Sequence, residues 1–214
     1  FVFAWIELVD AHRAEPRHLA ILAVVYAAVM LVGMSLYGVE QWVRNADAFG
    51  VAFGLLALLA PLHWADRELR LRPPLAGATR MPQVSGAVAV VVTMIATTTF
   101  DGFSQGSVWT GTDGLLQRLT DTFDGLGVGR EWAIQGAGTA GMFAVLLIVA
   151  GLYRLGVAGM HTVAGDRSTD DLAMRFAHTL IPIAFAYLVA HYFSLLLFQG
   201  QAVAFLISDP LGQG

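Results

Sequence analysis

Long apolar runs separated by short polar segments dominate this sequence. Most of these runs approach the twenty or so apolar residues that an α-helix needs to cross a bilayer. The predicted membrane spans are residues 19–37, 48–62, 84–100, 132–153 and 176–198. The apolar start of the chain, residues 1–9, is typical of the end of an earlier span. The pattern therefore predicts an all-α fold, a polytopic transmembrane helix bundle of about five spans.

The second run, residues 48–62, is short and contains glycine. A re-entrant segment, which enters and leaves the membrane on one side, is the alternative to a full span. The distribution of arginine tests this choice, because cytoplasmic loops carry an excess of positive charge.

Three polar segments, 10–18, 63–83 and 154–175, hold nine of the twelve arginines, and the remaining three lie in 38–47 and 101–131. We therefore expect the first three segments in the cytoplasm, and loop 101–131 and the C-terminus on the exterior. Five full spans fit this bias better than a re-entrant second run. A re-entrant run would place the arginine-rich segment 63–83 on the same side of the membrane as the acidic segment 38–47.

Loop 101–131 contains one amphipathic stretch, residues 115–123. Its apolar positions Leu115, Leu116, Leu119 and Phe123 share one helical face. We expect a helix that lies on the membrane surface or caps the bundle, with a moving lid as the alternative.

Composition agrees with a membrane location, since 57% of the residues are hydrophobic and 13% are charged. The chain has no cysteine, which excludes disulfides and thiolate metal sites. It starts on an apolar run without Met, so we expect residues 1–214 to be a single integral membrane domain and a segment of a longer chain. The expected partners are membrane lipid and other membrane helices, either its own missing segments or partner subunits, and not nucleic acid.

Several polar side chains are predicted to converge near the outer leaflet. Ionisable groups inside a membrane are costly and usually mark a functional site. Carboxylates with an imidazole can bind a divalent metal, so His191 and Asp101 are candidate metal ligands, although their spacing matches no recognised motif. The alternative is that the carboxylates cap helices and that His191 forms a hydrogen bond between helices. The full set is Glu40, Asp47, Asp101, His191, Gln199, Gln201 and Asp209.

The strongest candidate binding loop begins where the third run ends. Threonines 97–99 can bond back to helix carbonyls and distort the helix end, while Gly102 and Gly106 allow close approach of a ligand. A serine nucleophile here needs a base within hydrogen-bond reach, and only His191 is predicted on this side. The candidate ligand-binding residues are Asp101, Ser104, Trp109, Gln199 and Gln201.

At the inner face we expect Glu7 to form an ion pair with Arg175 or His178, with a proton relay as the alternative. His178 and His191 are thirteen residues apart, about 20 Å along a helix, so they do not form one compact site. Such spacing resembles that of two-haem cytochromes, but haem needs matching histidines on a second predicted span, and we do not expect it.

Small residues form pairs four apart in the fourth run. Gly136 with Ala140, and Ala137 with Gly141, let helix backbones approach closely in lipid. We expect this face to be a packing seam.

Six short motifs lie at residues 37–42, 47–50, 98–104, 176–184, 190–194 and 199–201. Together they resemble the actinobacterial multi-pass membrane proteins named fenitrothion hydrolase-like. The resemblance covers nearly the whole chain. It implies a membrane location, a hydrolase activity and a family whose members extend beyond both ends of this chain.

Three classes of function follow from these patterns. The preferred one is a transport or metal-handling protein with a polar site near the outer leaflet, where a broken helix end lines a cavity. The second is an accessory subunit of a larger membrane complex. The third is a membrane-embedded, metal-dependent hydrolase of organophosphate-like esters, in which Asp101 and His191 hold a metal that activates water.

Overall fold

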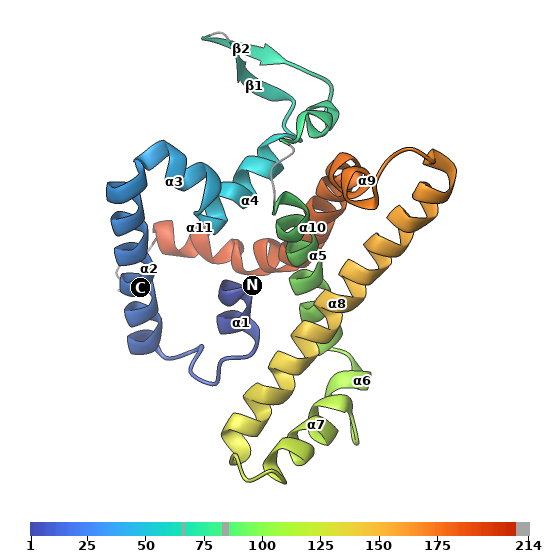
Figure 1. Ribbon diagram of the computed structural model, residues 1–214. Helices are drawn as coiled ribbons and strands as arrows, with labels where there is room; N and C mark the ends of the chain where they lie inside the picture. Colours follow the sequence, from blue (N-terminus) through green and yellow to red (C-terminus); the bar gives the residue numbers. More distant parts are fainter. Residues whose placement is uncertain (66, 83–85, 209–214) are drawn as a thin grey trace.

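The computed structural model describes residues 1–65, 67–82 and 86–208. It is helical apart from one short β-hairpin (Figure 1). The elements are α1 (Val2–Leu8), α2 (Pro16–Tyr37), α3 (Val39–Asn45), α4 (Ala48–Ala57), β1 (Leu62–Ala65), β2 (Glu68–Leu71), η1 (Ala76–Arg80), α5 (Ala87–Ser104), α6 (Ser107–Thr110), α7 (Leu115–Asp124), α8 (Arg130–Ala164), α9 (Thr169–Phe176), η2 (Ala177–Thr179), α10 (Leu180–Gln199) and α11 (Gln201–Ser208).

Four helical stretches in the described residues are long and apolar enough to cross a membrane. They are Pro16–Tyr37, Ala87–Ser104, Arg130–Val163 and the combined stretch Thr169–Ser208. Four of the five predicted spans thus coincide with helical stretches that could cross a membrane. The 35 residues of α8 are about 52 Å long, well beyond the ~30 Å hydrocarbon core, so this helix extends past the membrane interior.

The predicted span 48–62 is wrong. Asp47 caps α4 by accepting a hydrogen bond from the Phe49 backbone N–H (3.1 Å), but the helix ends at Ala57 after ten residues. That is about 15 Å, half of the hydrocarbon core. Pro61, which has no N–H to donate, follows, and the chain turns into β1.

Arg72 binds the open end of α4. Its Nη2 donates to the carbonyls of Ala57 (3.0 Å) and Leu58 (2.9 Å), and its Nε donates to that of Ala60 (2.9 Å). The last carbonyls of a helix have no partner within the helix, so an arginine that bonds three of them stabilises this early end. The chain therefore turns back at the end of α4.

The loss of one span changes which segments share an end of the molecule. Residues 10–18, expected with the arginine-rich loops, lie instead beside the start of α8, where His12 Nε2 is 3.9 Å from Glu131 Oε1. In Figure 1 this segment and α7 lie at one end of α8, while α9 and the hairpin lie at the other. Removing a span between 10–18 and 63–83 places these two segments at opposite ends.

Three clusters of buried side chains join the helices. One holds Leu55 of α4, Ile95 of α5 and Ile181 of α10. The smallest packs Val157 of α8 against Leu172 of α9. The second cluster brings Val9, Phe100 of α5 and Trp109 of α6 together with Met142 of α8. The helix predicted at 115–123 is α7, whose Leu116 and Leu119 pack against this second cluster. It therefore caps the bundle.

The small-residue seam on α8 is confirmed for Ala137 and Gly141. Ala137 is fully buried. A Cβ atom on Gly141 would come within 2.9 Å of both Phe100 Cε2 and Trp109 Cζ3, closer than side chains tolerate. The two aromatic rings, 5.5 Å apart and edge to face, thus lie directly on the backbone of α8.

Gly141→Ala is expected to lower the free energy of unfolding by about 1 to 3 kcal/mol, because the added methyl group overpacks the contact with Trp109. Gly151→Ala is the matched control, since open space surrounds that glycine of the same helix and alanine favours helix by about 1 kcal/mol. Unfolding in detergent, followed by circular dichroism, measures both. Equal stability of the two variants would contradict the packing described for α8.

Arg72→Ala is expected to leave three carbonyls at the end of α4 without their donor and to loosen residues 57–75. Hydrogen exchange there should increase by at least about tenfold, since each bond to a charged donor contributes about 1.5 kcal/mol or more. Arg44→Ala, which removes only an exposed pair with Glu40, is the control. Unchanged exchange in Arg72→Ala would show that Pro61 alone ends the helix.

Candidate functional site

Asp101 and His191 meet between α5 and α10. His191 Nδ1 lies 2.8 Å from Asp101 Oδ2, a hydrogen-bond distance, and the two side chains are 33% and 14% exposed. Asp101 belongs to the last turn of α5, and His191 to the middle of α10. The two helices pack together through Ile95 and Ile181, which brings the polar residues face to face.

The imidazole faces the carboxylate through Nδ1. With its proton on Nδ1, the ring has a lone pair on Nε2, which bonds to no residue in the described part of the chain. Tyr192 packs edge to face on the ring of His191, with centroids 4.6 Å apart. Glu7 and Asp101 both lie within electrostatic range of Tyr192, so α1 adds a second carboxylate to this region. The site carries excess negative charge while the imidazole is neutral.

The candidate metal pair is thus brought together, but only as a pair. Across the described ranges, no group of three or more His, Cys, Asp or Glu side chains has a metal-binding arrangement. Structural and catalytic metal sites take at least three protein ligands in most cases. Within the described residues, Asp101 and His191 thus meet as a single pair of one carboxylate and one imidazole.

The other candidate ligand-binding residues do not join this pair. Ser104 Oγ donates to the Asp101 carbonyl (2.7 Å) and so closes the end of α5. Trp109 is buried against Phe100. Gln199 and Gln201 are exposed where α10 meets α11, about 12 Å or more along the helix from His191.

The remaining polar residues predicted near the outer leaflet have local roles. Glu40 pairs with Arg44, and Asp47 caps α4 and accepts a hydrogen bond from the Tyr26 hydroxyl (2.6 Å). Asp209 lies outside the described residues. Ser104 Oγ is bonded to a carbonyl and is therefore not held against His191 as a nucleophile would be.

Among the described residues, Arg175 and His178, the predicted partners of Glu7, contact other groups. Arg175 Nε donates to Asp171 (2.9 Å), and His178 Nδ1 lies 2.7 Å from the Arg175 carbonyl oxygen. Glu7 is exposed on α1, which packs against the first half of α8, where Trp5 Nε1 donates to Thr139 Oγ1 (2.8 Å).

A second ionisable cluster, which sequence analysis missed, joins the α1–α2 connection to α8. The buried Asp10 carboxylate accepts hydrogen bonds from the His12 backbone N–H (3.0 Å) and lies 2.7 Å from His18 Nε2, while His12 also approaches Glu131. The Asp-x-His spacing was the available signal, since an Asp commonly bonds to the N–H two residues on. Burial raises the pKa of Asp10, but the bonds from His12 and His18 and their positive charges outweigh it and lower this pKa overall.

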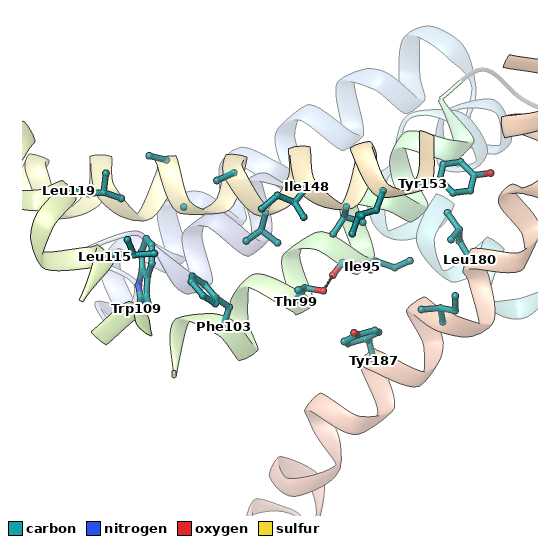
Figure 2. Close-up of a pocket in the computed structure, with 17 residues that line it drawn as sticks. Ile95, Thr99, Phe103, Trp109, Leu115, Leu119, Ile148, Tyr153, Leu180 and Tyr187 are labelled. Carbon is teal, nitrogen blue, oxygen red and sulfur yellow. Dashed lines mark hydrogen bonds between the residues drawn. The ribbon is translucent and has the colours of Figure 1, made fainter. Parts of the chain in front are cut away.

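An apolar cavity of about 800 Å³ lies between α5, α7, α8 and α10 (Figure 2). Thr99 and Tyr153 use their hydroxyls locally, donating to the carbonyls of Ile95 (2.7 Å) and Ala173 (2.5 Å). The Tyr187 hydroxyl has no partner among the described residues, and Tyr187 lies one helical turn before His191 on the same face. The lining also includes Phe103, Trp109, Leu115, Leu119, Ile148, Leu180 and Ile183.

Comparisons of the chain with protein-family models, curated proteins and solved structures find no match. The resemblance to the fenitrothion hydrolase-like membrane proteins stays a prediction from the sequence motifs. What bears on function is therefore the geometry of the Asp101 and His191 pair and of the apolar cavity next to it.

Asp10→Asn is expected to lower the free energy of unfolding at neutral pH by about 2 kcal/mol, because it removes the charge that His12 and His18 face. The pKa of Asp10 is lowered in the folded state, so its contribution is complete above the unfolded value near 4 and is lost as the pH falls through the folded value. The difference from wild type should therefore shrink below pH ~4.

Unfolding midpoints in detergent across pH measure this difference. Asp166→Asn, which changes an exposed carboxylate after α8, is the control and should match wild type at every pH. A difference between Asp10→Asn and wild type that persists in acid would contradict the role of the charge.

Proposed function

We propose that this multi-pass membrane protein binds and transports a lipophilic cation, with Asp101 and His191 as its proton-binding pair. The observation that carries the proposal is the 2.8 Å contact between a carboxylate and an imidazole on two helices long and apolar enough to cross a membrane. Ionisable groups at such depth mark ion or substrate pathways more often than structural contacts.

Proton exchange at this pair follows from its chemistry. A neutral imidazole can accept a proton and a carboxylate can pair with a cation, and here the two groups lie 2.8 Å apart. Protonation of His191 neutralises the negative charge of Asp101 and weakens the attraction for another cation. Release of that proton restores the attraction. Cation binding and proton binding at this site are therefore expected to compete.

The cavity supports the class of solute. Its apolar lining suits a hydrophobic body of drug-like size, and its volume is within the range of small-molecule sites. Tyr187 connects this lining to His191, and Glu7 and Asp101 supply negative charge nearby. An apolar body that carries one positive charge satisfies both features.

Binding of tetraphenylphosphonium to the purified protein tests the proposal. We expect Asp101→Asn to weaken binding by about tenfold or more, which corresponds to 1.4 kcal/mol, and to remove its dependence on pH. His178→Ala is the control, since this ring bonds to the Arg175 carbonyl away from the cavity. Binding that is equally tight in Asp101→Asn would overturn the proposal. Zinc binding that requires both Asp101 and His191 would favour metal handling instead.

The proposed orientation places the hairpin end in the cytoplasm and loop 105–129 outside. In a four-span topology the hairpin end holds eight arginines against four at the other end, which agrees with the positive-inside rule. The eight are Arg44, Arg67, Arg70, Arg72, Arg80, Arg154, Arg167 and Arg175, and the four are Arg13, Arg17, Arg118 and Arg130.

Single cysteines in this cysteine-free chain test the orientation in intact cells. A membrane-impermeant maleimide should label Arg13→Cys and Asp113→Cys from outside, and Asp166→Cys only after permeabilisation. If Arg13→Cys and Asp166→Cys react from the same side of the membrane, the topology has five spans. That result would contradict a turning point of the chain at the end of α4.

A second candidate function, a subunit of a larger membrane complex, is favoured by α2. Only 6% of its apolar window is buried, and within the described residues its main packing partner is the short α3. Native mass spectrometry from mild detergent distinguishes a lone chain from a complex of defined stoichiometry.

A further inference from the structure

The β-hairpin is amphipathic. Its strands pair antiparallel, with Leu62 opposite Leu71 and Trp64 opposite Leu69. Side chains alternate between the faces of a strand, so these two pairs share one face and the pair of His63 with Arg70 lies on the other. One face is thus entirely large and apolar, whereas the opposite face carries charge, with Arg70 in an ion pair with Glu68 (3.5 Å).

Nothing in the described chain covers the apolar face. Its four side chains are between 54% and 78% exposed, and Figure 1 shows the hairpin projecting from the helices. An isolated two-stranded hairpin is marginally stable in water, and monomeric proteins rarely expose such a patch without a binding role. The apolar face of the hairpin therefore needs lipid or a protein partner to cover it.

We propose that the apolar face of the hairpin lies in the interfacial region of a bilayer that contains anionic lipid. The hairpin is continuous with the membrane helices: Arg72 ties it to α4, and the segment after it leads into the span α5. This connection keeps it near the membrane surface. Tryptophan with leucine is the composition that favours the interface, and residues 62–80 hold four arginines against Asp66 and Glu68.

This inference is independent of the proposed function. It assigns the hairpin as a surface anchor at the arginine-rich end of the molecule, and it needs no solute. A protein partner or a second copy of the chain would cover the same face without lipid contact, so an experiment must separate lipid from protein.

Spin labels on the full chain make this separation, because the wild-type chain contains no cysteine. Leu69→Cys and Arg70→Cys are adjacent residues on opposite faces. In vesicles of phosphatidylcholine with phosphatidylglycerol, the label at 69 should collide mainly with oxygen, which concentrates in lipid. The label at 70 should collide mainly with a water-soluble nickel chelate. Leu71→Cys and Glu68→Cys repeat the comparison at a second pair, and circular dichroism checks that each variant is folded.

The proposal is overturned if both faces collide equally with the nickel chelate, as a hairpin in water would. It is also overturned if the label at 69 is shielded from both reagents, which indicates protein contact. In vesicles of phosphatidylcholine alone we expect the label at 69 to lie at a shallower depth. An unchanged depth would contradict the role of anionic lipid.

Discussion

The three hydrogen bonds from Arg72 to the end of α4 are the constraint on which the rest of the arrangement depends. They stabilise a helix of ten residues that ends before Pro61, so the chain returns to the end from which α4 began. Everything before α4 is thereby reversed relative to a five-span bundle. The Asp10 cluster comes to lie beside Glu131, and α1, which carries Glu7, packs against the first half of α8, while Arg175 pairs with Asp171.

Within that topology, close packing on α8 allows a polar pair to form beside an apolar cavity. Gly141 lets Trp109 and Phe100 lie against the backbone of α8, which positions α5. Asp101 on the last turn of α5 then reaches His191 on α10. The cavity remains between these helices where the side chains of α5, α8 and α10 do not meet. A site with negative charge next to apolar walls is what distinguishes this bundle chemically.

The two ends of the molecule differ in what they present to their surroundings. One end carries the buried Asp10 carboxylate with two histidines, packed against α8. The other carries an uncovered hairpin and most of the arginines. Both features follow from the same short α4, because a full span in its place would have put residues 10–18 and the hairpin at one end.

The sequence by itself determined the helical class, four apolar stretches long enough to cross a membrane, the amphipathic helix α7 and the packing role of Ala137 and Gly141. Each depends on local hydrophobic periodicity or residue size. It also identified Asp101 and His191 as worth attention. Only the tertiary structure decided that these two meet, that Ser104, Trp109 and the glutamines do not join them, and that Glu7 pairs with neither Arg175 nor His178. Such contacts depend on which helices are neighbours, and packing between helices far apart in the sequence sets this, which no local pattern contains.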